Sequence, residues 1–311
     1  MSTSKYRAFA AAAELRNITR AAELLGYTQS GVSHLINALE AELGVTLLIR
    51  AKSGTVLTPE GEALLPYVQR VLAAEQDVIS KATDLRGLTT GKLRIATFSS
   101  VAIHWLPRIL ARFRECCPGV ELSVTNGNYA EVEEALLQNA VDCGFVALPS
   151  REEFSVMPLA RDRLLAVLSS TDPLADRTTL TPEDMTEKTF IMPAEGLNYS
   201  IGKLFSRAGV TLRARLDIND DYAAVAMVRQ GLGVTILPEL MVRELPTGGL
   251  RWVPIKDSER EIGIAVHRSR CPSPAIRAFL GCVQEILKTQ ALAPADEKSC
   301  AEGPFPRTGS Q

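Results

Sequence analysis

Uncharged polar side chains recur at helical spacing between residues 29 and 37, opposite a strip of apolar ones. The polar set comprises Gln29, Ser30, Ser33, His34 and Asn37. Gln29 and Asn37 can each form two hydrogen bonds to an adenine edge, and the serine hydroxyls can bond bases or phosphates. A solvated helix face would explain the same pattern, but this face lacks long side chains that form salt bridges. Its composition therefore favours contact with nucleic acid.

The residues around this face predict a helix-turn-helix. Thr19 has the residue type of an N-cap for a helix over 20–25, and Gly26 ends that helix. Thr28 then caps a third helix over 29–43. Two short helices joined by a tight glycine turn place the second one for the major groove, which admits an α-helix.

A short hairpin follows, with strands predicted at 45–48 and 55–57 around a turn at 52–54. We interpret it as the wing of a winged helix-turn-helix. Further members of the predicted DNA-binding set lie on the wing and at the two helix starts: Thr19, Arg20, Thr28, Arg50 and Lys52. Residues 1–60 hold six Lys or Arg and five Glu, a net charge of +1, so charge does not carry this prediction.

A long amphipathic helix is predicted from Thr58-Pro59-Glu60 to about residue 86. Threonine at the cap, proline at the first helical position and glutamate in the first turn are typical of a helix start. Apolar side chains then recur every three or four residues, at Leu64, Val68, Val71, Val78, Ala82 and Leu85. This strip can pack on its own chain or on a second copy of the helix. We expect self-pairing, because little nearby chain is available to cover the strip.

From residue 92 onward, short apolar strands alternate with amphipathic helices, which predicts an α/β fold with a mostly parallel sheet. Strands are expected at 93–98, 120–125, 143–148, 164–169, 189–192, 214–218, 234–237 and 261–266. Helices are expected at 101–117, 131–139, 199–208, 222–230 and 274–287. The pattern indicates two similar lobes enclosing a cleft, with the chain crossing back into the first lobe near its end. The Pro-, Ala- and Ser-rich segment 291–311 is expected to be disordered.

Two loops are candidates for binding a ligand in that cleft. Residues 97–101 end a strand and open a helix, so free backbone N–H groups and two hydroxyls favour an anion there. Residues 193–200 form a similar loop before the next helix. The candidates in the two loops are Thr97, Ser99, Ser100, Val101, Pro193, Asn198 and Ser200. The ligand stays open, because the two adjacent serines can equally act as N-caps and the carboxylate of Glu195 would repel an anion.

Composition and motifs exclude several classes of function. Hydrophobic residues make up 46% and charged residues 23% of the 311, as in globular proteins, and no run approaches the roughly 20 apolar residues of a membrane span. The N-terminus lacks the apolar core of an export signal, so we expect a cytoplasmic protein. The six cysteines show no CxxC pair or zinc-ligand spacing and are expected to be free thiols. With no phosphate-binding motif and no nucleophile–base pair, we expect no enzyme, no metal and no cofactor.

The run ITRAAELLGYTQSGVSHLINALEAELG at residues 18–44 resembles the N-terminal signature of LysR-type transcriptional regulators. Residues 47–50 (LLIR) and 57–61 (LTPEG) match the wing and the linker-helix start of that family. Weaker similarity includes QGLGV at 230–234 and extends over about residues 5–287. Leu48 and His34 depart from the Phe and Arg that are frequent in the family. The resemblance implies a winged helix-turn-helix, a dimerising linker helix and a two-lobed, periplasmic-binding-protein-like effector domain, usually assembled as a tetramer.

The resemblance also implies a division of the chain and a set of partners. The expected domains are a DNA-binding domain at 1–60, a linker helix at 61–91, lobe I at 92–161 and 262–290, and lobe II at 162–261. Asn126, Phe145 and Thr235 join the two loops as expected lining of the effector site. The expected partners are double-stranded promoter DNA, a small-molecule effector and further copies of the chain as a homodimer or homotetramer, with RNA polymerase as a further candidate and no membrane. The alternative is a small-molecule-binding protein without a transcriptional role, against which the helix-turn-helix and the missing export signal count.

Overall fold

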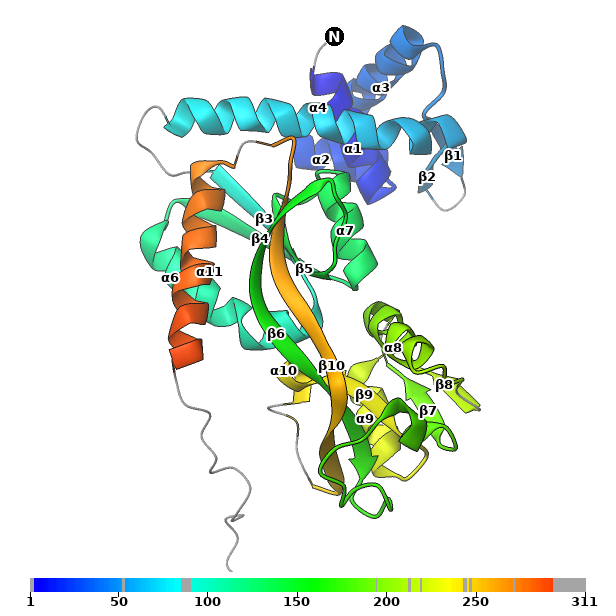
Figure 1. The fold of residues 1–311 in the computed structure, drawn as a ribbon. Helices are drawn as coiled ribbons and strands as arrows, with labels where there is room; N and C mark the ends of the chain where they lie inside the picture. Colours follow the sequence, from blue (N-terminus) through cyan, green and yellow to red (C-terminus); the bar gives the residue numbers. More distant parts are fainter. Residues whose placement is uncertain are drawn as a thin grey trace, which may run out of the picture.

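The protein has three parts in chain order: a small helical part, one long helix and a two-lobed α/β part (Figure 1). The computed structural model describes residues 3–51, 54–84, 91–193, 195–211, 214–218, 220–242, 245, 248–270 and 272–292. Of the tail expected to be disordered, residues 291–292 end the last helix and 293–311 lie outside the described residues.

The N-terminal part packs three helices and a hairpin around a core of small side chains. Its elements are α1 (Thr3–Leu15), α2 (Ile18–Leu25), α3 (Gln29–Leu43), β1 (Leu48–Ala51) and β2 (Gly54–Leu57). Buried alanines such as Ala8, Ala12 and Ala21 let the helices approach closely. The prediction that Thr19 caps α2 was wrong: Asn17 is the N-cap, and its Oδ1 accepts a hydrogen bond from the Arg20 N–H at 3.1 Å.

The turn and the start of α3 confirm two other predictions. Gly26 ends α2 with φ of 70°, a left-handed conformation that glycine adopts without strain. Thr28 caps α3, because its Oγ1 accepts from the Gly31 N–H at 3.1 Å. The first strand was predicted too early. The Glu40 carboxylate accepts from the N–H groups of Leu47 and Leu48 at 2.6 and 3.2 Å, and β1 starts only at Leu48.

The long helix is α4 (Pro59–Asp84), and Thr58 caps it as predicted. The Thr58 Oγ1 accepts from the Gly61 N–H at 2.9 Å and donates to the Thr46 carbonyl at 2.7 Å. The apolar strip of α4 is buried in one part of the helix and exposed in another. Val68 is buried against α1 and α3 of its own chain, whereas Val78 is 70% exposed. The first half of α4 therefore anchors the helix to the N-terminal part, and Leu85 lies outside the described residues.

Six strands form one mixed sheet in the order β4-β3-β5-β10-β6-β9. Its strands are β3 (Gly91–Thr97), β4 (Val120–Asn126), β5 (Cys143–Leu148), β6 (Phe154–Ser169), β9 (Thr235–Pro238) and β10 (Leu250–His267). β3 pairs in parallel with β4 and β5, but β10 runs antiparallel to β5 and β6, and β6 antiparallel to β9. The expectation of a mostly parallel sheet was therefore wrong. The sequence pattern predicts strands only at the apolar ends of β6 and β10. The other halves of both strands are polar, so the pattern does not show that they continue as long antiparallel strands.

The long strands β6 and β10 run through both lobes (Figure 1). Lobe I adds α5 (Ser99–His104), α6 (Leu106–Cys116), α7 (Tyr129–Leu137) and α11 (Pro274–Leu292). Lobe II adds β7 (Thr189–Met192), α8 (Glu195–Arg207), β8 (Ala214–Asp217), α9 (Asp221–Arg229) and α10 (Glu239–Val242). The helix predicted at 101–117 is in fact two helices that meet at Trp105. Pro107 explains the break, because proline lacks the N–H that would bond the Ile103 carbonyl and continue the first helix, whereas it is well tolerated in the first turn of the second.

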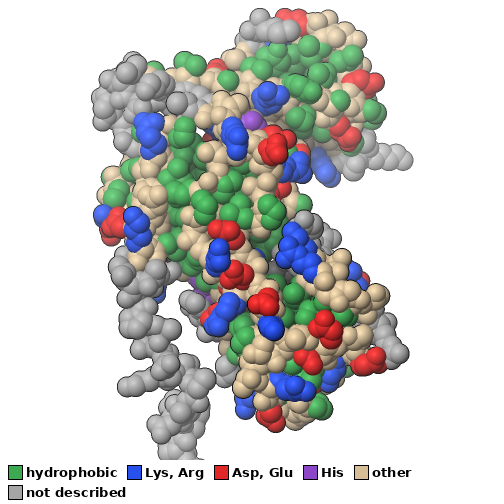
Figure 2. All heavy atoms as spheres, viewed as in Figure 1, with side chains coloured by type: hydrophobic (Ala, Val, Ile, Leu, Met, Phe, Trp, Pro, Cys, Tyr) green, Lys and Arg blue, Asp and Glu red, His purple; other side chains and the backbone are tan. Residues whose placement is uncertain are grey.

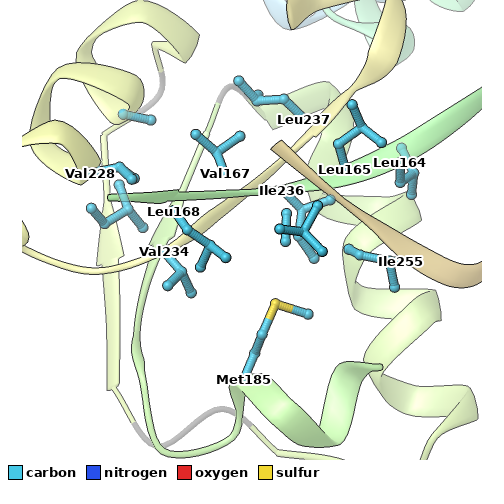
Figure 3. Packing of buried hydrophobic residues seen from close by; sticks show 14 of the residues in the cluster. Leu164, Leu165, Val167, Leu168, Met185, Val228, Val234, Ile236, Leu237 and Ile255 are labelled. Carbon is cyan, nitrogen blue, oxygen red and sulfur yellow. The ribbon is translucent and has the colours of Figure 1, made fainter. Parts of the chain in front are cut away.

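Each lobe has a hydrophobic core of its own. In lobe I, Phe113, Phe145 and Phe279 are fully buried among the strands, α6 and α11. In lobe II, Val167 and Ile236 pack with other aliphatic side chains against Met185 and α9 (Figure 3). Each lobe thus has its own core, although Leu240 of α10 packs into that of lobe I, and β6 and β10 carry the chain between the lobes.

The described residues contain no helix with the length and apolarity that a membrane crossing requires. They also hold no group of three or more His, Cys, Asp and Glu arranged for a metal ion. The four cysteines within this part of the chain, Cys116, Cys117, Cys143 and Cys282, are free thiols, as predicted.

Candidate DNA-binding face and ligand cleft

The polar residues predicted on α3 share one face of that helix. Gln29, Ser30, His34 and Asn37 are exposed, and Ser33 is half-buried. The opposite face buries Val32, Ile36 and Leu39 in the N-terminal core. The Thr28 and Ser30 hydroxyls lie 3.1 Å apart at the start of the helix. Burial of the apolar side thus fixes the orientation of α3 and leaves its amide and hydroxyl groups toward solvent.

Of the four residues predicted to contact DNA phosphate, two lie on α2 and two on the wing. Thr19 and Arg20 are exposed in the first turn of α2. Nothing is described of the side chains of Arg50 and Lys52, so their predicted roles stay predictions.

Two other basic residues of the N-terminal part are bound to carboxylates. Lys5 Nζ lies 2.6 Å from Glu42 Oε1, and this hydrogen bond lowers the pKa of Glu42. Arg7 Nη2 lies 3.0 Å from Glu75 Oε2, which ties α1 to α4. Arg16 and Arg20 are the other Lys or Arg residues of this part whose side chains are described; both are exposed, and Arg20 is the one predicted to contact DNA phosphate.

The structure brings part of the predicted ligand set together where β3 and β4 end. Ser99 Oγ accepts from Asn126 Nδ2 at 3.4 Å, and Ser100 Oγ accepts from Arg260 Nη2 at 2.7 Å. Neither serine caps α5: the N-cap residue is Phe98, whose side chain makes no capping bond. The N-cap alternative for Ser99 and Ser100 is therefore wrong.

The other predicted ligand residues lie elsewhere. Val101 and Phe145 are buried in the core of lobe I, and Thr97 is buried beside them, its hydroxyl 3.4 Å from the Phe98 carbonyl. Thr235 is buried on β9 of lobe II, and its Oγ1 has no hydrogen-bond partner among the described residues. Pro193 is buried just after β7, while the side chains of Asn198 and Ser200 lie outside the described residues. No hydrogen bond within the described chain joins Thr235 to Ser99 or Asn126.

Sequence reasoning missed a buried arginine at the crossing of the long strands. Arg260 on β10 donates from Nε and Nη2 to Asp162 Oδ2 on β6, at 2.9 and 2.6 Å. Asp162 Oδ1 in turn accepts from the Leu240 N–H of α10 at 2.9 Å. Arg260 also donates to the Tyr129 hydroxyl of α7. Burial alone would lower the pKa of Arg260, but Tyr129 and Asp162 outweigh it and raise that pKa, so the guanidinium stays charged.

This cluster of Arg260, Asp162, Tyr129 and Ser100 connects elements of both lobes. The sequence does not single it out, because Asp162 and Arg260 are the middle residues of two charged triplets, RDR at 161–163 and ERE at 259–261. Charged side chains are almost never fully buried unless they are paired, but the sequence does not show which charge of each triplet points inward.

A cavity of about 660 Å³ lies between the lobes beside this cluster. Its wall includes Tyr129 and Pro149 from lobe I, Leu204 and Arg207 from lobe II, and Arg260 from the crossing strands. A space-filling view shows the hollow between the lobes, with basic side chains on its rim (Figure 2). The volume lies within the roughly 300–1,000 Å³ typical of small-molecule sites.

A helix-turn-helix with a wing, a long connecting helix and a two-lobed α/β domain with a cavity together define a DNA-binding protein that carries a small-molecule-binding domain. Two family descriptions match this chain: "Bacterial regulatory helix-turn-helix protein, lysR family" over residues 3–62, and "LysR substrate binding domain" over residues 86–288. The chain therefore belongs to the LysR family of transcriptional regulators.

Similar proteins agree with this assignment. The probable HTH-type transcriptional regulator LrrA of Synechococcus elongatus is 36% identical over 292 residues, which cover 92% of this chain and 97% of that protein. A full-length OxyR variant from Pseudomonas aeruginosa has a similar fold, with a TM-score of 0.75 at 21% identity over 93% of this chain and 95% of that one. Full-length CbnR in complex with its target DNA has a TM-score of 0.64 at 24% identity, over 92% and 99% of the two chains.

Proposed function

We propose that this LysR-family regulator reads operator DNA with the polar face of α3 and responds to a small molecule bound between its lobes. The observation that carries the first half is the exposed amide and hydroxyl face of α3, held outward by the burial of Val32, Ile36 and Leu39. A helix of this kind fits the major groove, where its first residues meet base edges. The relative CbnR, solved with its target DNA, supports this use of the shared fold.

The exposed apolar side chains of α4 support a symmetric assembly. Tyr67, Val71 and Val78 are 62%, 43% and 70% exposed and recur along one stretch of the helix. Pairing two such helices would bury these side chains and carry two copies of α3. Two recognition helices about 34 Å apart meet successive major grooves, so weak half-sites sum to useful affinity. We propose a homodimer as the DNA-binding unit, and a homotetramer formed by two of them.

The separate hydrophobic cores of the two lobes support a division of the chain. We propose 1–60 as the DNA-binding domain, 61–91 as the linker, 92–161 with 262–290 as lobe I, and 162–261 as lobe II. Effector binding changes the angle between the lobes, and this alters how the linker helices present both copies of α3. The protein acts in the cytoplasm, where its DNA is, and carries no catalytic activity.

Gel-shift analysis with genomic fragments tests the proposal. Specific retention of a subset of fragments is expected. The variant Gln29→Ala should weaken specific binding by about 1–3 kcal/mol if the contact to adenine is bidentate, with the thermal unfolding of the protein unchanged. Gln230→Ala, which removes an exposed glutamine from lobe II, is the matched control and should bind as the wild type does.

Two outcomes would contradict the proposal. Unchanged discrimination between operator and random DNA in Gln29→Ala would show that another face of the protein reads the bases. Ligand binding without retention of any fragment would support the alternative, a small-molecule-binding protein without a transcriptional role.

A further inference from the structure

Two cysteines that are far apart in the sequence meet between two helices of lobe I. α6 and α11 lie side by side over the core of that lobe (Figure 1). Arg112 Nε on α6 lies 3.1 Å from Glu285 Oε1 on α11. Cys116 follows Arg112 by one helical turn, and Cys282 precedes Glu285 by one turn. The ion pair and the two cysteines therefore follow one another along the same seam between the helices.

The thiols of Cys116 and Cys282 are in hydrogen-bond contact across this seam. The rings of Phe113 and Phe279 hold the same two helices together, edge-to-face with centroids 5.6 Å apart. An S–S bond is about 2.05 Å long, so the two sulfurs must approach further for a bond to form. Cys116 is the last residue of α6, and Cys117 already leaves the helix with φ of −135°. The chain at Cys116 can therefore adjust without breaking the helix.

The two thiols differ in access and in charge. Cys116 is exposed, whereas Cys282 is only 4% exposed, so a dissolved oxidant reaches Cys116 first. Burial raises the pKa of the Cys282 thiol to about 11, with Cys116 and Glu285 acting in the same direction and Arg112 in the opposite one. Cys282 therefore keeps its proton near pH 7. The Arg112 guanidinium also interacts with Cys116, but two carboxylates already share its charge.

Cys282 is a better partner for Cys116 than the other cysteines whose side chains are described. Cys117 is the neighbour in sequence, and a bond to it would close a small ring that distorts the planar peptide between them. Cys117 is also buried, and burial raises the pKa of its thiol. Cys143 is fully buried on β5. The contact between the helices thus selects Cys282.

We propose that Cys116 and Cys282 form a reversible disulfide that joins α6 to α11, with a low-molecular-weight disulfide such as oxidised glutathione as the oxidant. In the first step the Cys116 thiolate attacks one sulfur of oxidised glutathione, a mixed disulfide forms, and one glutathione thiolate leaves. In the second step Cys282 gives up its proton, its sulfur attacks the Cys116 sulfur, and the second glutathione thiolate leaves. Two protein thiols are oxidised, and one oxidised glutathione takes up their two protons and becomes two reduced molecules.

The first step prepares the second. A mixed disulfide at Cys116 carries neither a charge nor a free thiol, so both effects of Cys116 that raise the pKa of Cys282 disappear. The second step is intramolecular between groups already in contact, which favours it over attack by a second glutathione. The product closes a long loop of chain and should stabilise lobe I. This inference goes beyond the proposed role in transcription and does not depend on it.

Peptide mapping after equilibration of the full-length protein in mixtures of reduced and oxidised glutathione tests the proposal. Free thiols are alkylated before digestion. Trypsin cuts after Arg114, Arg151, Arg277 and Lys288, so the crosslink should join peptide 115–151 to peptide 278–288. The crosslinked fraction should rise with the share of oxidised glutathione and disappear when reduced glutathione is restored in excess.

Two variants identify the cysteine that reacts. Cys116→Ser changes an exposed position, so the protein should fold, and the crosslink between the two peptides should be lost. Cys117→Ala removes the neighbouring thiol of the same peptide and is the matched control, which should crosslink as the wild type does. Oxidation should also raise the midpoint of urea unfolding in the wild type and in Cys117→Ala, but not in Cys116→Ser. If Cys117→Ala does not fold, fragmentation of the crosslinked wild-type peptides identifies the bonded cysteine.

Three results would overturn the proposal. The first is oxidation that stops at a mixed disulfide of Cys116 with glutathione at every ratio of the two forms. The second is a bond between Cys116 and Cys117, or a crosslink that persists in Cys116→Ser. The third is a crosslinked dimer on a non-reducing gel, which would place the bond between two copies of the chain.

Discussion

Single buried charges hold distant segments of this protein together. The Asp142 carboxylate accepts from the Arg94 N–H and Nη2, both at 2.8 Å, and from Arg270 Nη1 at 2.9 Å. Burial would raise the pKa of Asp142, but the two arginines outweigh burial and the pKa is lowered. One side chain thus ties β3 to the start of β5 and to the turn before α11.

The variant Asp142→Asn should therefore destabilise lobe I, by about 3 kcal/mol, since breaking a buried pair leaves the partner charges uncompensated. The midpoint of urea unfolding, followed by the fluorescence of the buried Trp105, measures the effect. Asp217→Asn, at an exposed pair with Arg215, is the control and should change stability by no more than about 0.5 kcal/mol. Equal midpoints for the two variants would show that Asp142 contributes no more than a surface charge.

His267 makes stability depend on pH at the junction of α4 and lobe I. Burial lowers its pKa below 6.5, and Arg70 and Arg270 lower it further, against the opposing effect of Glu153. A depressed pKa means that the unfolded chain binds the proton more readily than the folded one, so stability falls as the pH drops below about 6.5 toward the folded-state pKa. The Tm should decline between pH 7.5 and 5.5, and His267→Gln should flatten this part of the profile. An unchanged slope in that variant would assign the pH dependence to other groups.

At this scale, sequence reasoning succeeds for local patterns and fails for distant pairs. The polar residues of α3 could be predicted because all of them lie within nine positions of one helix. Arg260 and Asp162 are 98 positions apart, and only the pairing of β6 with β10 brings them together. No periodicity in one strand reveals the register of that pair.

At the scale of elements, the wing is held by a glycine that no other residue replaces without strain. Gly54 has φ of 122°, and a Cβ there would lie 2.5 Å from the Arg16 carbonyl oxygen. That oxygen accepts from the Thr55 N–H at 2.9 Å, which attaches the hairpin to the end of α1. The wing can occupy its position only because position 54 lacks a side chain.

Gly54→Ala should loosen the wing and weaken DNA binding, because both the backbone conformation and the close contact become unfavourable, at a cost of roughly 1–3 kcal/mol. Hydrogen exchange of the Thr55 amide measures the loosening directly. Gly281→Ala in α11, where a Cβ meets open space, is the control and should stabilise the protein by up to about 1 kcal/mol. Unchanged protection of the Thr55 amide in Gly54→Ala would argue against this account of the wing.

Element types could be predicted better than element boundaries. Most helices and strands were predicted where the structure has them, because the apolar spacing is local. The errors have different causes. At β1, the Glu40 carboxylate binds the N–H groups of Leu47 and Leu48, so strand pairing starts later than the apolar pattern indicates. At β6 and β10, the strands extend into polar segments because they pair with each other over a long sequence separation.

At the scale of the whole molecule, α4 leaves apolar surface that the described residues do not cover. Val78→Asp should convert the dimer to a monomer, because pairing would bury an unpaired carboxylate at the 70%-exposed position. Sedimentation velocity measures the change, and affinity for a two-half-site operator should fall along with it. Leu232→Asp replaces a similarly exposed residue of lobe II, 57% exposed, and should leave the assembly intact. A dimer that survives Val78→Asp would place the subunit interface on another surface.

The two crossing strands set the way in which the lobes can move. β6 and β10 are continuous through both lobes, and their ladder shifts register between Pro254 and Glu259 and again between Ile262 and Gly263. A Cβ at position 263 would lie 2.6 Å from Val156 Cγ1, so the second irregularity is built in by the glycine. Because both strands are continuous between the lobes, we expect any change in the angle between the lobes to bend β6 and β10, and to bend them most at these two register shifts.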